Sequence, residues 1–475
     1  MKHLLNSLAT VFVALVTFAS CQSNADLEFE SLSSNGKETT NVITRSARDG
    51  FESYWDSLEP INWAELNSLE ERFKYFNLPE SEVKALSSET LLHLIVNYPL
   101  NYLILAYNKP VNAIKLVYEY SSIHKEFLNR DNAVTLLVDH FNSCDCSAKS
   151  PTPISEYNFV DELFLEYTLV SGMFDLSNEK HLLKSAIMRK LDLYKKDESM
   201  NSDLTLSPLY EIENLINYAT VSTEPGTNLY NLSIYTPIFQ ELVGFRRAEM
   251  TSQQKIDLYN MVSQFYPNAI YRGPATYNYN CHSYAWYDNS TSNNVWLDAY
   301  YGGTFQLSKY WSTNDVYSSC SHEEAEKAYY PDGDHSVIVL GPDRVISKWG
   351  AWPLMEHCYL NCPYLATNIE YYKFSPKSTP YFVMSAISGN SSFLVETSQE
   401  FRIPKKVPGV TYVWSVQPMS SQSSSSYSMS TTSSGNLLLT CHEYGAYRVR
   451  ADFYYKGNNI SFNYIIAVAT GSPTY

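Results

Sequence analysis

The first twenty residues constrain this chain most, because they remove one end of it from the fold. Lys2 gives a basic start, residues 8–18 form an apolar run, and Ala19-Ser20-Cys21 follows. A basic start, an apolar stretch too short to span a bilayer and small residues before a cut site predict a signal peptide. We therefore expect residues 1–20 to be removed and the rest to fold outside the cytoplasm, where thiols are readily oxidised.

The cysteine after the expected cut site predicts a membrane anchor. Phe18-Ala19-Ser20-Cys21 resembles the lipobox of bacterial lipoproteins, which implies that Cys21 is acylated and tethers the exported chain to a bacterial membrane, at the periplasmic face or the cell surface. An ordinary secretory signal with an incidental cysteine is the alternative. Residues 21–49 are polar and rich in Ser, Asn and Thr, which predicts a disordered tether.

Length and charge limit the classes of protein to consider. The 475 residues suggest about three domains, since a domain spans roughly 150 residues. The net charge is −16 and the pI is about 5.1. A protein that binds nucleic acid needs a basic face, so this negative charge argues against nucleic acid as a partner. The sequence has no phosphate-binding loop or Gly-rich dinucleotide motif, and we expect no cofactor.

Hydrophobic periodicity divides the exported chain into three parts. Residues 50–222 carry apolar residues at helical spacing between polar and Pro-containing breaks, which predicts an all-α domain. Residues 223–378 are richer in Gly and Tyr and have short alternating runs and the highest density of Cys and His, which favours a mixed α+β domain. Residues 379–475 alternate with the period of strands and predict an all-β domain.

Two motifs in the all-β part indicate its architecture. They are Gly409-Val410-Thr411-Tyr412-Val413-Trp414 and Gly445-Ala446-Tyr447-Arg448-Val449. They resemble the PKD-like, immunoglobulin-type modules of bacterial surface proteins. The resemblance implies a β-sandwich in which Trp414 fills the core and Tyr447 pins a corner. Such modules serve adhesion, spacing or partner contact.

The stretch with the most chemical information is Tyr277-Asn278-Tyr279-Asn280-Cys281-His282-Ser283-Tyr284-Ala285-Trp286. Loop residues precede it and helix-compatible residues follow. Cys281 is therefore expected at the start of a helix, where unpaired N–H groups favour the thiolate. Downstream, Asp332-Gly333-Asp334-His335-Ser336 leads into an apolar strand with His335 at its first position. A reactive thiol and an imidazole are the groups that nucleophilic catalysis by cysteine requires.

A Cys at a helix start followed by a His that opens a strand resembles the papain-like NlpC-type and CHAP-type cysteine peptidases and amidases. The resemblance implies a papain-like domain with Cys281 as nucleophile and His335 as base. A third polar residue stands about a dozen positions after the His in that pattern. Here this position holds Ser347, where the family usually has His, Asn or Asp, and His357 is the alternative. The same blocks resemble those of uncharacterised exported bacterial proteins.

These observations predict a multidomain fold with an all-α N-terminal domain, a papain-like α+β domain and a C-terminal all-β immunoglobulin-like sandwich. The expected function is a cysteine hydrolase that cuts a peptide or related amide, such as a cell-wall-like peptide, outside the cytoplasm. The backbone N–H of Cys281 would bind the oxyanion, with Asn280 and Tyr279 as side-chain candidates. The alternative is a non-catalytic surface lipoprotein that binds a partner or glycan with an inactive hydrolase-like scaffold.

The remaining cysteines leave the disulfide pattern open. The sequence has eight cysteines, so an odd number remains after Cys21, and at least one thiol is free or pairs between chains. Cys320 with Cys358 or Cys362 is the expected disulfide in an oxidising compartment. These residues, with His322 and His357, also offer zinc-ligand types, but their spacing is irregular and we expect no metal site.

Overall fold

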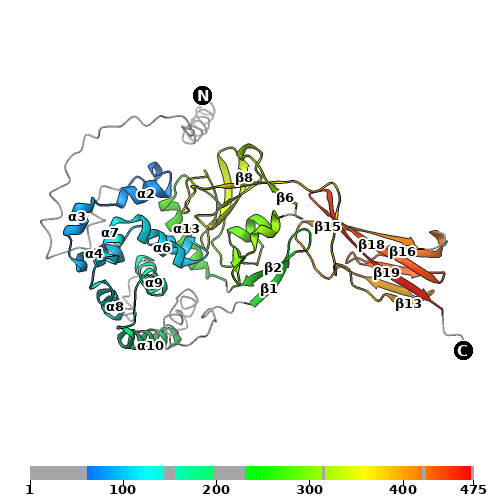
Figure 1. The fold of residues 1–475 in the computed structure, drawn as a ribbon, viewed down its shortest axis with the longest axis horizontal. Coiled ribbons are helices and arrows are strands. Elements are labelled where there is room, and N and C mark those ends of the chain that lie inside the picture. Colours follow the sequence, from blue (N-terminus) through cyan, green and yellow to red (C-terminus); the bar gives the residue numbers. More distant parts are fainter. Residues whose placement is uncertain are drawn as a thin grey trace, which may run out of the picture.

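The computed structural model describes residues 61–143, 156–196, 230–247, 249–312, 316–419 and 424–471. Its N-terminal region is helical and its C-terminal region is rich in antiparallel sheets, which confirms the coarse expectation (Figure 1). The predicted signal peptide, the predicted lipidation site Cys21 and the predicted tether lie outside the described residues. In the part of the chain that the structure describes, no helix has the length and apolar character needed to cross a bilayer.

The helical region consists of short helices whose ends follow local sequence signals. Ser68, Ser87 and Ser121 each cap a helix by accepting a hydrogen bond from a backbone N–H of its first turn. Pro110 begins another helix, at a position where a backbone N–H would have no partner within the helix. The helices are α2 (Leu69–Phe76), α3 (Glu80–Ala85), α4 (Ser88–Val96), α5 (Leu103–Ala106), α6 (Pro110–Tyr120), α7 (Ser122–Leu128), α8 (Ala133–Ser143), α9 (Glu156–Val170) and α10 (Lys180–Lys196).

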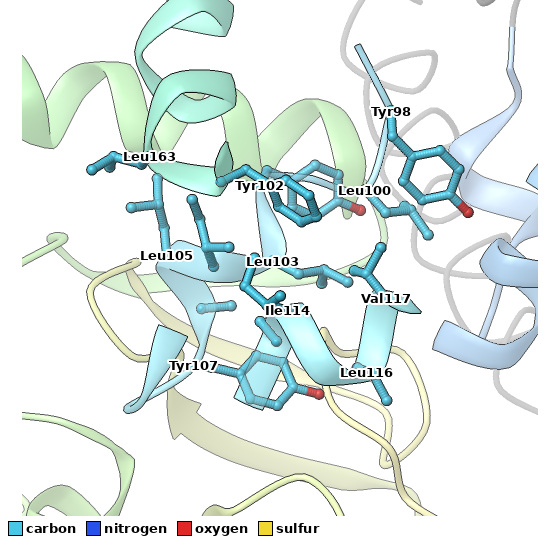
Figure 2. Close-up of a cluster of buried hydrophobic side chains, with 14 of the residues drawn as sticks. Tyr98, Leu100, Tyr102, Leu103, Leu105, Tyr107, Ile114, Leu116, Val117 and Leu163 are labelled. Atoms are coloured by element: carbon cyan, nitrogen blue, oxygen red, sulfur yellow. The ribbon is translucent and has the colours of Figure 1, made fainter. Parts of the chain in front are cut away.

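The apolar faces of these helices meet around the segment 98–107. Figure 2 shows Leu100, Leu103 and Ile114 gathered in this core, and all three side chains are fully buried. Burying one such side chain contributes about 2 kcal/mol. The core therefore fixes the connection between α5 and α6.

A seven-stranded antiparallel sheet forms the centre of the next part, in the order β3-β10-β9-β8-β7-β11-β6. Its strands are β3 (Ile270–Gly273), β6 (Tyr317–Ser319), β7 (Lys327–Tyr330), β8 (His335–Gly341), β9 (Arg344–Lys348), β10 (Leu354–His357) and β11 (Glu370–Phe374). Helix α13 (Ser252–Phe265) precedes the sheet and begins with a capping box made by Thr251 and Gln254. The strands β8 and β9 form a hairpin whose turn follows Gly341.

The helical region and this sheet share one apolar core. The Ala351 backbone N–H donates to the Leu105 carbonyl at 3.1 Å, and the Tyr364 hydroxyl donates to the Ala106 carbonyl at 2.6 Å. Gly350 has a φ of +50°, and a Cβ at this position would overlap the Ala106 carbonyl oxygen. The two backbones can approach so closely because glycine has no side chain.

Two short hairpins and several short helices complete this part. β1 (Tyr230–Tyr235) pairs with β2 (Glu241–Arg246), and β4 (Tyr300–Tyr301) pairs with β5 (Thr304–Phe305). Trp286 lies in a second core, where Tyr310 and Tyr317 pack against its ring. The short helices of the described chain are η4 (Trp63–Glu65), η5 (Ser283–Tyr287), η6 (Leu307–Tyr310), η7 (His322–Glu324) and η8 (Ser424–Ser426).

The C-terminal strands form two sheets that contribute to one apolar core. One sheet contains β12 (Tyr381–Phe382), β13 (Ser392–Leu394), β15 (Val410–Pro418), β18 (Gly445–Tyr455) and β19 (Asn458–Thr470). The other contains β14 (Ser398–Phe401), β16 (Tyr427–Thr431) and β17 (Leu437–Cys441). The pairings are antiparallel except those of β12 and β13 with β19, which are parallel.

Two aromatic residues of this C-terminal part have defined polar contacts. Trp414 is buried, and its indole N–H donates to the Gly435 carbonyl at 3.0 Å. Tyr447 is fully buried, and its hydroxyl donates to the Glu443 carbonyl at 2.9 Å. Buried aromatic rings with a polar group need such partners, because an unpaired buried donor is costly.

Candidate active site

Cys281 lies in the first turn of a short helical segment, as the sequence predicts. Asn280 caps this segment, because its Oδ1 accepts the Ser283 backbone N–H at 3.1 Å and its own N–H donates to Ser283 Oγ at 3.4 Å. The turn that follows is the π-helix η5, and the Asp288 N–H donates to the Ser283 carbonyl at 2.9 Å. Wide turns of this kind are frequent at functional sites. The Cys281 side chain is fully buried.

The start of β8 faces this segment. Asp334 has a φ of +45°, in the left-handed region that Asp tolerates better than most residues. Ser336 Oγ accepts the Trp286 indole N–H at 3.0 Å and lies 2.8 Å from His282 Nδ1. Asp334 Oδ1 lies 3.3 Å from His282 Nε2. The residues on either side of His335 therefore hold His282, which is the residue after Cys281.

His282 is a buried cation. Burial alone lowers the pKa of His282, but the charge of Cys281 and the carboxylate of Asp334 outweigh this effect and raise the pKa to about 10. Burial likewise raises the pKa of Asp334, yet the hydrogen bond and the charge of His282 bring that pKa below its ordinary value. His282 thus places a positive charge in the residue next to Cys281.

His335 differs from His282 in its pKa. Its side chain is fully buried, and burial lowers its pKa well below the ordinary histidine value, with the charges of His357 and His282 lowering it further. Neither ring nitrogen has a hydrogen-bond partner among the described residues. The ring stacks on Tyr364, with ring centroids 3.7 Å apart and an interplanar angle of 12°, and it meets Tyr330 edge-on. His335 is thus a neutral imidazole that aromatic rings hold in place.

Asn108, from the connection between α5 and α6, reaches the same cluster. Its Nδ2 lies 3.3 Å from Cys281 Sγ and 3.2 Å from the backbone carbonyl oxygen of Asp334. One side-chain nitrogen therefore contacts both the thiol and the turn that leads into His335. Asn108 is buried as well.

A pocket of about 360 Å³ opens next to this cluster. Its lining combines charged and aromatic residues: Lys109, Asn112, Tyr300, Phe305, Tyr329, Pro331, Asp334 and Glu370. Because Cys281, His282 and His335 have no exposed surface, Asp334 is the member of the cluster that reaches the pocket. The volume lies near the lower limit for sites that bind small molecules.

Lys348 is a buried lysine near the site. Its Nζ donates to the carbonyl oxygens of Thr276 at 3.2 Å and Gly350 at 2.7 Å, and also to that of Trp352. Burial lowers the pKa of Lys348 to about 7, and the negative charges of Cys281 and Glu249 oppose that shift. The lysine ties the loop before Cys281 to the turn that packs on the helical region.

The two predicted third residues contact each other instead of His335. Ser347 Oγ lies 2.8 Å from His357 Nε2 and accepts the Trp349 indole N–H at 3.0 Å. His357 Nδ1 lies 2.8 Å from the Cys358 carbonyl oxygen. The prediction that Ser347, or alternatively His357, orients His335 by a hydrogen bond is therefore wrong. The polar groups of Ser347 and His357 are occupied by one another and by their neighbours.

The two side chains predicted as oxyanion donors, those of Asn280 and Tyr279, differ in their contacts. Asn280 uses both N–H groups of its side chain, which donate to Asn108 Oδ1 at 3.1 Å and to the Leu297 carbonyl at 2.8 Å. No N–H of this side chain remains for a substrate, so the prediction for Asn280 is wrong. Tyr279 is buried and stacks on Tyr284, and its hydroxyl has no hydrogen-bond partner among the described residues.

The predicted disulfide of Cys320 with Cys358 or Cys362 is also wrong. Cys320 and Cys362 are free thiols, whereas Cys358 is disulfide-bonded. The Cys362 thiol is buried and lies 3.5 Å from the Tyr359 carbonyl oxygen, a position in the core rather than in a cross-link. Across the described ranges, no group of three or more His, Cys, Asp or Glu side chains is arranged to hold a metal ion.

Sequence reasoning missed four polar residues of the site. His282 directly follows Cys281 in the sequence, and Asp334 directly precedes His335. This adjacency was the available signal. Lys348 follows Ser347 in the same strand. Asn108 has no comparable signal, because it lies in the helical part, more than 170 positions before Cys281.

No protein-family model matches this chain, and no curated protein matches its sequence. Its function is therefore inferred from the residues described above, and from their geometry.

Proposed function

We propose that the chain is an exported, lipid-anchored cysteine hydrolase that cuts a peptide or related amide with Cys281 as nucleophile and His335 as base. One observation carries the proposal. Two segments distant in sequence, 280–287 and 334–336, meet beside a pocket, where His282 contacts Asp334 and Ser336 and Asn108 contacts both Cys281 and the Asp334 carbonyl. Perturbed titratable groups next to a pocket are typical of catalytic sites.

The chemistry assigns a different task to each histidine. His335 is neutral and has unoccupied ring nitrogens, so it can take the proton of the Cys281 thiol. The sulfur then forms a bond to the amide carbonyl carbon, and the carbon–nitrogen bond breaks as His335 returns the proton to the leaving amine. Water hydrolyses the resulting thioester and restores the thiol. His282 stays protonated at neutral pH, and its positive charge stabilises the negative charge that the sulfur gains as the proton moves to His335.

The finer fold assignments belong to the same proposal. A Cys in the first turn of a helix and a His at the first position of a strand are the arrangement on which the papain-like resemblance rests. In the C-terminal part, buried Trp414 and the hydrogen bond from Tyr447 to the Glu443 carbonyl support an immunoglobulin-type, PKD-like sandwich. Such a module would hold a partner or space the hydrolase from the membrane.

One observation favours the rival function, a binding protein with an inactive hydrolase-like scaffold. Cys281 and His335 have no exposed surface, whereas the pocket next to them has aromatic and charged walls. A partner or glycan could bind such walls without contacting the thiol. The two functions differ in the reactivity that they predict for Cys281.

The rate of alkylation of Cys281 by iodoacetamide separates them, with peptide masses identifying the modified thiol. At about pH 6 a free thiol with a pKa of about 8.5 is almost fully protonated and reacts slowly. The proposal predicts that Cys281 reacts at this pH, and that His335→Ala slows the reaction at least about tenfold. Cys320, a free and partly exposed thiol of the same chain, is the internal reference.

His322→Ala is the matched control, because His322 packs on Tyr359 and Tyr371 and belongs to no part of the cluster. It should leave the Cys281 rate unchanged. A Cys281 that does not react, or that reacts like Cys320 whatever residue stands at position 335, would instead establish the binding scaffold.

A further inference from the structure

The connection between α5 and α6 is fixed against the sheet on both sides of Asn108. Upstream, the Leu105 and Ala106 carbonyls accept hydrogen bonds from Ala351 and Tyr364. Downstream, Pro110 begins α6. Asn108 is 6% exposed, so the packing of the helical region on the sheet holds it in one place.

The hydrogen-bond network determines which way the Asn108 amide faces. The Asn280 Oδ1 accepts the backbone N–H groups of Ser283 at 3.1 Å and Leu297 at 3.2 Å, so the Asn280 Nδ2 must be the donor toward Asn108. Asn108 Oδ1 is the acceptor of that bond, and its Nδ2 consequently faces Cys281 Sγ and the Asp334 carbonyl. Reversing the amide would place two acceptor oxygens against each other.

We propose that the Asn108 amide is a catalytic residue of the site, which donates a hydrogen bond to the oxyanion that forms when Cys281 attacks an acyl carbonyl. The inference rests on the proposed function. The carbonyl carbon bonds to Sγ during the attack, so its oxygen develops charge within reach of a donor that lies 3.3 Å from the sulfur. One Asn108 N–H stays on the Asp334 carbonyl, and the N–H that faces Sγ turns to the oxyanion as the sulfur lone pair enters the new bond. Asn280, whose N–H groups are both engaged, positions this donor.

Asn108 transfers no proton in this step. The thiol proton goes to His335, the sulfur–carbon bond forms, and the carbonyl π electrons move to the oxygen, where the Asn108 N–H stabilises them. The electrons return as the bond to the leaving group breaks. Losing one preorganised oxyanion donor typically slows such a step about 100- to 1,000-fold.

Two small reagents separate this role from simple support of the thiolate. p-Nitrophenyl acetate acylates a thiol through a tetrahedral oxyanion, whereas iodoacetamide alkylates it by direct displacement without one. We expect Asn108→Ala to slow the p-nitrophenol burst about 100-fold and to change the alkylation rate less than about threefold at the same pH. Asn108→Asp keeps the size and the acceptor toward Asn280 but removes both donors, and it should lose the burst as well.

Asn97→Ala is the control, since Asn97 is an exposed helix-end residue that donates to the His93 carbonyl. Circular dichroism of each variant confirms that it is folded. Equal slowing of acylation and alkylation would overturn the oxyanion role while leaving the cysteine hydrolase intact, as would a burst that Asn108→Ala and Asn108→Asp both retain. A wild-type Cys281 that iodoacetamide does not modify would overturn both proposals.

Discussion

Asp334 is the residue at which the pocket and the buried cluster meet. Its carboxylate lines the pocket, accepts the Tyr329 hydroxyl at 3.5 Å and pairs with His282. A substrate in the pocket would therefore change the surroundings of the group that keeps His282 charged. This carboxylate lies one residue before His335, the proposed base.

The His282–Asp334 pair predicts a pH-dependent stability. The folded-state pKa of His282, about 10, exceeds its ordinary value of 6.5, so its contribution is complete below about pH 6.5 and disappears as the pH rises to about 10. We expect Asp334→Asn to lower the free energy of unfolding by about 3 kcal/mol at about pH 6. The difference from wild type should shrink toward about pH 10.

Urea unfolding followed by tryptophan fluorescence at several pH values measures this difference. Asp332→Asn is the control, because the Asp332 carboxylate is bonded to Asn368 and Thr367 and not to a histidine. It should show no such pH trend. A difference between wild type and Asp334→Asn that stays constant from about pH 6 to 10 would mean that His282 is not the charged partner.

At the scale of elements, the sequence contained the local signals of the site but no information on which distant segments contact each other. Residues 277–286 and 332–340 predict a helix start and a strand start, because caps, turns and periodicity act over a few residues. Which polar groups pair across the fold depends on packing between distant segments. For that reason Ser347, assigned to His335 from its spacing, is bonded to His357 on the neighbouring strand β10.

The disulfide prediction failed for the same reason, because cysteine pairing depends on contacts between distant segments. The expected oxidising compartment favoured a disulfide of Cys320 with Cys358 or Cys362, yet the strands and loops that carry Cys320 and Cys362 leave both thiols free. By contrast, the alternating strands of the C-terminal part follow from period-2 patterns. Trp414 and Tyr447 are buried, which agrees with the places that the resemblance to immunoglobulin-type modules implies for them.

At the scale of the whole molecule, the helical region is part of the site. It supplies Asn108 and the pocket residues Lys109 and Asn112, and it shares a core with the seven-stranded sheet. No periodicity could indicate this, because hydrophobic patterns show that a face is buried but not what covers it.

Gly350 tests how tightly the two parts are joined. Gly350→Ala should lower the free energy of unfolding by about 3 kcal/mol, because the new methyl group would overlap the Ala106 carbonyl in addition to the backbone strain at positive φ. Gly302→Ala has a similar φ, +55°, with open space around it, and should cost about 1 kcal/mol. Thermal unfolding of both variants measures the difference. Equal losses would show that the close approach at Ala106 adds nothing to stability.

The most direct measurement is to identify the side chain that carries an acyl group after the protein is mixed with p-nitrophenyl acetate. Peptide masses taken over time would locate the acetyl group and follow its loss to water. A cysteine hydrolase predicts acetylation of Cys281 that then disappears, with no such adduct in Cys281→Ser. Acetyl groups confined to lysines or to Cys320, with Cys281 unmodified throughout, would contradict the account.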